Sequence, residues 1–427
     1  MARQTWALFG PNTGPARLGS VEQEVIMTNG QYQPDASGPL HDVRVVDMTP
    51  LAAGNMLTHM LADFGAEVIK IERPGVGDDL RRFGKSDVWW KEFARSKKSF
   101  TLNFRSEDGE KLLLDLIAKS DMLVENFVPG TLEKWGLGPD RLWEINPNLI
   151  IVRISGWGQT GPYREKPGFG SLIEGLSGFS AMTGFPDRPP LLPPLALADM
   201  VAGLTGFGAA VVALLARTKG EAKGQVVDLS LFEPLFSALG PWVATYKVAG
   251  TVPQRQGNRT EVAAPRNVYV CSDGKHLAMS GSMQSMWEKL AESIGRPELI
   301  EDERFLTNTD RVQNNDILDP IIAEFIGARI LAENMVLFDA AGVTAGPIAD
   351  PSDLIDHEYI RGRGVIEDFP DELHGTLPLH SVFPRLSETP GTIRTPAPAL
   401  GQHTEEILNL LGRNAGEQGR LRDTGAV

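Results

Sequence analysis

Apolar runs alternate with segments of helical spacing through the first half of the chain. Residues 43–47 and 66–71 are strand-like runs, and between them apolar side chains recur at helical spacing over 51–64. A strand, a helix and a second strand in this order form a βαβ unit with a parallel pair. The alternation continues with expected strands at 99–104, 122–126 and 149–154 and expected helices at 108–119, 140–145 and 171–179. We therefore predict a doubly wound, Rossmann-like α/β domain for this half.

The pattern changes after residue 224. We expect a strand at 225–230, a helical stretch at 232–249, a hairpin at 267–280, helices at 283–294, 317–329 and 332–341, short strands at 364–369 and 375–379, and a closing helix at 404–411. This mixture predicts a smaller α+β domain. The expected division is an N-terminal extension at 1–40, a large domain at 41–224 completed by 395–427, a linker at 225–252, a small domain at 253–345 and a return linker at 346–394.

Composition excludes several classes of protein. The 427 residues are 42% hydrophobic and 22% charged, as in ordinary globular proteins. The net charge of −14 argues against nucleic-acid binding and against a membrane-surface role. The seven histidines show no metal-ligand spacing, and a single cysteine, Cys271, fits a reducing compartment. The start of the chain lacks a signal-peptide core and the apolar run 200–216 is short for a membrane span, so we expect a cytoplasmic protein.

Asp199 stands out within the segment 191–220. It is the only charge between Arg188 and Arg217, and it precedes an uncharged run rich in glycine and alanine where a helix should start. One interpretation is an N-cap aspartate that accepts the free amide protons of the helix. The other is an ionised carboxylate held by the same amides at the mouth of a pocket, where it acts as a nucleophile. The local pattern leaves both open.

A ligand site is expected at the carboxyl ends of the first strands. The loop 72–78 is rich in turn residues and follows a strand, which is where open α/β sheets bind ligands. The first turn, 49–55, carries one glycine, so the dinucleotide fingerprint is absent and a nicotinamide cofactor is disfavoured. Basic residues that suit phosphates gather near these strand ends: Arg73, Arg81, Arg82, Lys97, Lys98 and Arg105.

Four segments carry a resemblance to a known family. They are the long stretch 43–82, which contains GAEVIKIERPG, then SKKSFTLNF at 96–104, LVENFVPGTLEKWGL at 123–137 and GQTGPY at 158–163. The chain resembles the class III CoA-transferases, from about residue 43 to residue 408. The resemblance implies a doubly wound large domain, a smaller α+β domain and a dimer of two interlocked rings. It also implies acyl-CoA and a carboxylic acid as substrates, with no tightly bound cofactor.

The resemblance assigns residues to this chemistry. The family's catalytic aspartate, which forms an acyl anhydride and then an aspartyl-CoA thioester, falls on Asp199. The positions that match its coenzyme A contacts are Arg73, Leu102, Phe104, Arg105, Asn126, Phe127, Lys134 and, in the expected glycine loop, Gly257.

Two positions depart from the family pattern. Gly170 stands where many relatives place an acid, and Glu174 either compensates as an auxiliary acid or is a charge on a helix face. Ala52 stands where formyl-CoA transferase has a glutamine, so we expect a roomier and less polar acyl site.

Three functions remain in view. We predict a transferase that moves CoA from an acyl-CoA, with succinyl-CoA as the candidate donor, to a carboxylic acid. The first alternative is a CoA-ester isomerase, lyase or racemase, although the His-Asp pair that the racemase branch needs is absent around 168–170. The second alternative is a non-catalytic, CoA-binding subunit of a heteromeric transferase.

Overall fold

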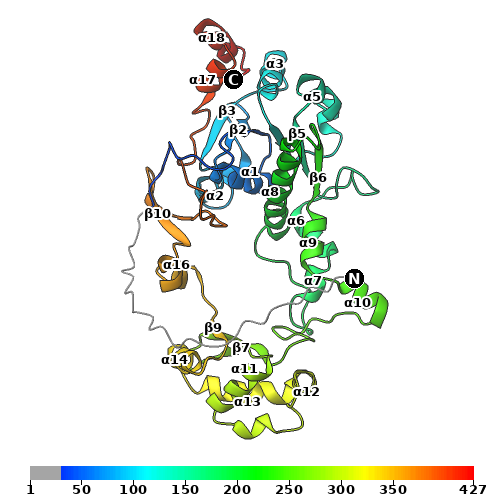
Figure 1. The fold of residues 1–427 in the computed structure, drawn as a ribbon, viewed down its shortest axis with the longest axis vertical. Coiled ribbons are helices and arrows are strands. Elements are labelled where there is room, and N and C mark those ends of the chain that lie inside the picture. Colours follow the sequence, from blue (N-terminus) through cyan, green and yellow to red (C-terminus); the bar gives the residue numbers. More distant parts are fainter. Residues whose placement is uncertain (1–29) are drawn as a thin grey trace, which may run out of the picture.

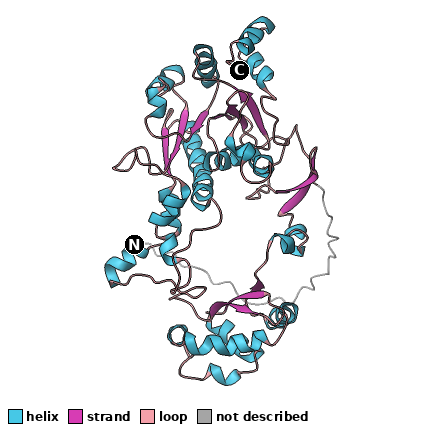
Figure 2. Cartoon of the chain, turned by 180° about the vertical axis from the view of Figure 1, so that it is seen from behind, coloured by secondary structure: helices cyan, strands magenta, loops and turns pink. Residues whose placement is uncertain are grey.

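The structure, a computed structural model, describes residues 30–427, so most of the expected N-terminal extension lies outside the described residues. The chain forms a ring of two bodies (Figure 1). The larger body carries a parallel sheet, and the smaller body carries an antiparallel one. The chain leaves the larger body after α10 (Trp242–Ala249) and returns after β9 (Ala345–Pro347), so two separate segments join the bodies (Figures 1 and 2).

The larger body is built on six parallel strands in the order β3–β2–β1–β4–β5–β6. Their bounds are β1 Arg44–Asp47, β2 Glu67–Glu72, β3 Lys97–Thr101, β4 Met122–Glu125, β5 Ile150–Ser155 and β6 Val226–Ser230. This order confirms the predicted doubly wound α/β fold. The expected linker 225–252 supplies β6 to the sheet. The strand order reverses between β1 and β4, and a ligand crevice lies at such a switch point.

Helices cover both faces of the sheet. On one face α1 (Ala53–Asp63) and α8 (Leu197–Thr218) enclose a core that includes Val45, whereas the adjacent Val46 faces the opposite core, because successive side chains of a strand alternate. The opposite core contains residues of α3 Glu107–Ile117, α5 Pro139–Ile145, α17 Thr404–Leu410 and α18 Ala415–Asp423. The closing helix predicted at 404–411 is therefore confirmed as α17.

Helix α8 packs closely on α1 because two of its glycines leave room. A Cβ at Gly203 would lie 2.7 Å from Met56, and one at Gly206 would lie 2.6 Å from Leu57. A third glycine of this helix, Gly208, faces open space. By length and composition α8 would suffice to cross a membrane. One side of α8 packs on α1 and β6, whereas apolar side chains of its other side, among them Val212, are exposed.

The smaller body is a three-stranded antiparallel sheet covered by helices. The predicted hairpin is confirmed as β7 (Arg266–Val270) and β8 (His276–Ser280), and β9 pairs with β8. Its helices are α11 Gln284–Ser293, η2 Pro297–Ile300, α12 Asn308–Gln313, α13 Asn315–Gly327 and α14 Leu331–Ala341. Trp287, Phe305 and Phe338 fill its core, and Cys271 is buried beside them.

The return segment 346–394 is also folded. It contains α15 (Pro351–Leu354), α16 (Glu358–Gly362) and the antiparallel hairpin of β10 (Ile366–Asp371) with β11 (Gly375–His380). The hairpin docks on the larger body through an ion pair of 2.7 Å between Lys91 and Asp371. The remaining elements are η1 Asp79–Arg82, α2 Val88–Phe93, α4 Thr131–Lys134, α6 Gly170–Leu176, α7 Phe179–Met182 and α9 Phe232–Ala238.

Candidate active site

Asp199 lies in the first turn of α8, at the wall of a pocket. The N-cap of this helix is Ala196, and no side chain caps it, so the N-cap interpretation of Asp199 is wrong. The pocket measures about 470 Å³, and its lining residues are Leu51, Ala52, Leu80, Phe83, Trp89, Phe169, Gly170, Ser171, Glu174, Pro193, Pro194, Leu195, Ala196 and Asp199. The carboxylate therefore faces a mainly apolar and aromatic space, which we call the acyl pocket.

The surroundings of Asp199 make it a weaker acid than an ordinary aspartate. Burial, and then the charge of Glu174, raise its pKa to about 6, against a smaller opposite effect of its own backbone amide. Glu174 is buried, and its Oε1 accepts a hydrogen bond of 3.3 Å from the amide of Ala198. Glu174 therefore occupies one of the free amides of α8 beside Asp199 and is not a solvent-facing charge.

Gly170, the first residue of α6, lies against the carboxylate of Asp199. A Cβ at this position would be 2.7 Å from Asp199 Oδ2 and 3.7 Å from Glu174 Oε1. A larger side chain at residue 170 therefore needs the Asp199 carboxylate to turn away. In this chain the second acid of the pocket comes from Glu174, one helical turn further on.

A second pocket, of about 320 Å³, lies at the carboxyl ends of β1, β2 and β3. We call it the nucleotide pocket. It brings together five of the residues that the sequence assigned to coenzyme A: Arg73, Leu102, Phe104, Arg105 and Phe127. Phe104, Phe127 and the nearby Trp135 form an aromatic cluster with centroid distances of 5.0 to 6.5 Å.

Only two of the six gathered cations remain available at this pocket. Arg81 pairs with Glu72, Arg82 with Asp79, Lys97 with Asp47, and Lys98 with Glu67 and Glu406. Within residues 30–427, Arg73 and Arg105 form no ion pair. Arg105 lies over the ring of Trp135, 5.3 Å from its centroid. Both arginines are exposed at the pocket rim, where a phosphate can reach them.

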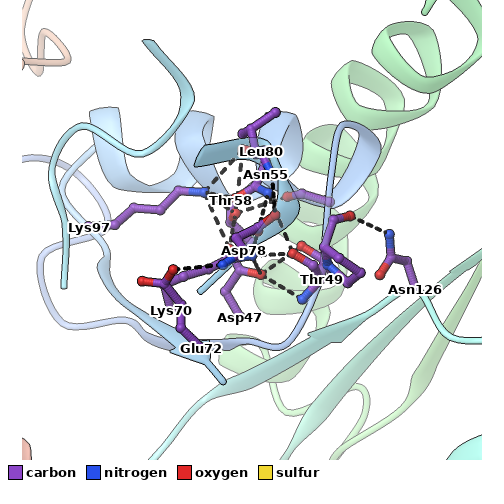
Figure 3. A network of polar contacts seen from close by, with 12 residues as sticks. Asp47, Thr49, Asn55, Thr58, Lys70, Glu72, Asp78, Leu80, Lys97 and Asn126 are labelled. Carbon is purple, nitrogen blue, oxygen red and sulfur yellow. Dashed lines mark hydrogen bonds and ion pairs between the residues drawn. The ribbon is translucent and has the colours of Figure 1, made fainter. Parts of the chain in front are cut away.

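The turn 49–52 separates the two pockets. Thr49 and Pro50 line the nucleotide pocket, whereas Leu51 and Ala52 line the acyl pocket. On the far side of the turn, Asn126 Nδ2 donates a hydrogen bond of 2.9 Å to the carbonyl of Pro50 (Figure 3). Its Oδ1 is buried and has no hydrogen-bond partner among the described residues. The two pockets are thus neighbours across four residues of backbone.

Two assigned residues lie elsewhere in the isolated chain. Lys134 ends α4 and lines a separate pocket of about 530 Å³ with Arg153 and Arg164. Gly257, with φ of +65°, donates its amide to the carbonyl of Gly184 at 2.9 Å. Neither lines the nucleotide pocket or the acyl pocket.

Sequence reasoning missed the aromatic wall of the acyl pocket. Phe83 follows η1, Trp89 belongs to α2 and Phe169 precedes α6, and no single motif links the three. The one signal in the sequence is the aromatic density of 83–93, close to the turn-rich loop 72–78. Within the described residues no group of three or more acidic, cysteine or histidine side chains could hold a metal ion.

The fold and the site define a class of protein: a doubly wound α/β protein whose switch-point pocket suits a phosphorylated ligand and neighbours a partly buried carboxylate. Comparison with known proteins agrees. The profile of CoA-transferase family III matches residues 40–404. The chain belongs to this family.

Named relatives and solved structures cover nearly the whole described chain. A succinyl-CoA–D-citramalate CoA-transferase of Chloroflexus aurantiacus is 40% identical over 88% of this chain and 94% of its own length. A succinyl-CoA–L-malate CoA-transferase alpha subunit from the same organism is 37% identical over 96% of this chain and 99% of its own. The crystal structure of a CAIB/BAIF family protein from Brucella suis superposes with a TM-score of 0.79, at 33% identity, over 88% of this chain and 100% of that one. These similarities support an acyl-CoA:carboxylate CoA-transferase.

Proposed function

We propose that this CoA-transferase acts through Asp199 as the nucleophile. The carboxylate attacks the thioester carbonyl of the donor, its C–S bond breaks, and a mixed anhydride and the CoA thiolate result. The thiolate attacks Cγ of Asp199, forming the aspartyl thioester and releasing the donor acid. An acceptor carboxylate then attacks Cγ, expels the CoA thiolate and forms a second mixed anhydride with Asp199. The thiolate finally attacks the acceptor carbonyl of this anhydride, which gives the new acyl-CoA and restores the Asp199 carboxylate. The observation that supports this sequence is a partly buried carboxylate, Asp199, in a pocket that neighbours one suited to CoA.

Different residues around the turn 49–52 bind different parts of the acyl-CoA in this proposal. We assign the phosphates of CoA to Arg73 and Arg105, and its adenine ring to the aromatic side chains near Phe104. Asn126 holds the carbonyl of Pro50 and so supports the turn that the pantetheine arm passes. The apolar wall of the acyl pocket excludes water, which protects the anhydride from hydrolysis.

Succinyl-CoA is the donor that we propose to test first, because both curated relatives described above are named for it. A neutral donor, butyryl-CoA, belongs in the same test. The lining of the acyl pocket in the described chain contains no lysine or arginine that would pair with the far carboxylate of a succinyl group.

We propose that two copies of the chain interlock through their rings. Large apolar side chains are exposed on several elements of the larger body, among them Leu176 on α6, Val212 on α8, and Val243 and Val248 on α10. Exposed apolar surface of this kind supports a subunit interface. A second candidate is a heteromer with a related subunit, because one relative is named as an alpha subunit.

Trapping with hydroxylamine tests the proposal. The purified chain is incubated with succinyl-CoA or butyryl-CoA and hydroxylamine, and its intact mass and peptides are measured. A hydroxamate at Asp199, absent from the Asp199→Ala variant, supports the covalent mechanism. Absence of any adduct, with CoA binding measurable by calorimetry, would instead support the non-catalytic subunit.

A further inference from the structure

Leu51 adopts a backbone conformation that its side chain disfavours. Its φ is +60°, in the left-handed region, where a leucine is strained by its Cβ. The residue stands at the boundary of the two pockets, since Pro50 lines the nucleotide pocket and Leu51 the acyl pocket. The conformation of Leu51 therefore sets the direction in which the turn 49–52 passes from one pocket to the other.

Both backbone polar groups of Leu51 are held by side chains. Its amide donates to Asp78 Oδ1 at 3.1 Å, and its carbonyl accepts from Asn55 Nδ2 at 2.6 Å. The same Asn55 Nδ2 donates to Asp78 Oδ2 at 2.9 Å, so the two side chains also hold each other. Strain of this kind persists only where surrounding contacts enforce it.

A buried lysine anchors this arrangement. Lys70 Nζ lies 2.9 Å from Asp78 Oδ2 and 3.1 Å from Asp47 Oδ1, and it also donates to the carbonyl of Thr49 within the turn. The Lys70, Asp78 and Asp47 side chains are all at least 98% buried, so each charge depends on its partner. Lys70 thus ties the start of the turn to the carboxylate that holds Leu51.

We propose that Asn55 and Asp78, with Lys70 behind them, are positioning residues that hold Leu51 in its left-handed conformation so that a thioester passing the turn 49–52 meets Asp199. The inference rests on the proposed function. These residues do not touch the reacting atoms, and they act through the backbone of Leu51. A solely structural role would lower stability without changing the turnover of the folded enzyme.

A double-mutant cycle between Asn55 and Leu51 tests this role. Asn55→Ala removes the donor to the Leu51 carbonyl, and we expect kcat to fall about tenfold while the KM for acyl-CoA changes less than about twofold. Glycine adopts a positive φ without strain, so residue 51 no longer depends on Asn55 in the Leu51→Gly variant. In that background Asn55→Ala should lower kcat less than about threefold. Asn55→Ser is the milder variant if the alanine variant does not fold.

The control is Asp63→Asn, which weakens a buried pair of 2.7 Å with Arg95 that does not touch the turn. It should lower the melting temperature and leave kcat unchanged. An unchanged kcat in folded Asn55→Ala, or an equal loss in both Leu51 backgrounds, overturns the inference while the wild-type exchange still stands. A wild-type chain that forms no Asp199 hydroxamate overturns the proposed function and this inference together.

Discussion

Glu174 on α6 and Asp199 in the first turn of α8 are two acids that meet at the start of α8. Glu174 Oε1 accepts the amide of Ala198, directly before Asp199, and its charge adds to burial in raising the pKa of Asp199 to about 6. At neutral pH Asp199 is therefore ionised, yet it is more basic than an ordinary aspartate. This combination favours attack on a thioester, because nucleophilic strength rises with basicity.

The pH dependence of exchange follows from this pair. Asp199 must lose its proton to attack, so kcat/KM should rise with pH through an inflection near pH 6. Glu174→Gln removes the neighbouring charge and should move this inflection to lower pH. Initial rates of CoA exchange between pH 4.5 and 8 give the inflection for the wild type and for Glu174→Gln. The control is Glu165→Gln, which changes an exposed acid. An inflection that stays in place in Glu174→Gln contradicts the coupling.

The stability of an Asp199→Asn variant should differ from wild type in a pH-dependent way. Since the folded pKa of about 6 lies above the ordinary 3.8, stability falls as pH rises between these values. Above pH 6 the ionised carboxylate costs roughly 2–3 kcal/mol. The asparagine variant should therefore be more stable than wild type by about this amount at pH 7.5, with a difference that shrinks toward pH 4. Urea unfolding at both pH values measures it.

The matched control is Asp187→Asn, which changes an exposed acid of the preceding loop and should leave the unfolding free energy unchanged. Equal stability of wild type and Asp199→Asn at pH 7.5 would show that the carboxylate is not destabilised in the folded chain.

Gly170 and Gly175 offer a matched pair on one short helix. Gly170→Ala places a methyl group 2.7 Å from Asp199 Oδ2, so the carboxylate must turn and kcat should fall about tenfold or more. Gly175 has no neighbour within 4 Å of an added Cβ, and alanine there should leave kcat unchanged and stabilise the helix by up to about 1 kcal/mol. Steady-state exchange and thermal melting separate the two effects. Full activity in Gly170→Ala would mean that Asp199 works in another orientation.

The sequence predicted the larger fold because parallel strands leave a strong pattern. Runs such as 149–154 are apolar except for Arg153, since both faces of the sheet are covered. Helix α18 was missed because its sequence is polar and only two of its side chains, Gln418 and Leu421, are buried. The sequence predicts the strand at 225–230. It does not predict that this strand pairs with β5, because periodicity carries no information on neighbours in the sheet.

The candidate site could be predicted only where motifs are local. The loop motifs located Arg73 and Arg105. They could not show that Arg81 and Lys97 are unavailable to a phosphate, because that follows from their ion pairs with Glu72 and Asp47 in the folded chain. Leu51 gave no signal at all, because a leucine is not expected at a positive φ and the groups that enforce it come from other elements.

Arg73 and Arg105 should determine the affinity for CoA. Both line the nucleotide pocket and form no ion pair with residues 30–427, so each can meet a phosphate without giving up a carboxylate partner. Each alanine variant should raise the KM for acyl-CoA about tenfold with kcat within about twofold, an effect that added salt reduces because it screens the attraction. The control is Arg82→Ala, a nearby arginine that pairs with Asp79 at 3.0 Å and lies outside the pocket lining. Unchanged KM values in both variants would place the phosphates of CoA elsewhere on the chain.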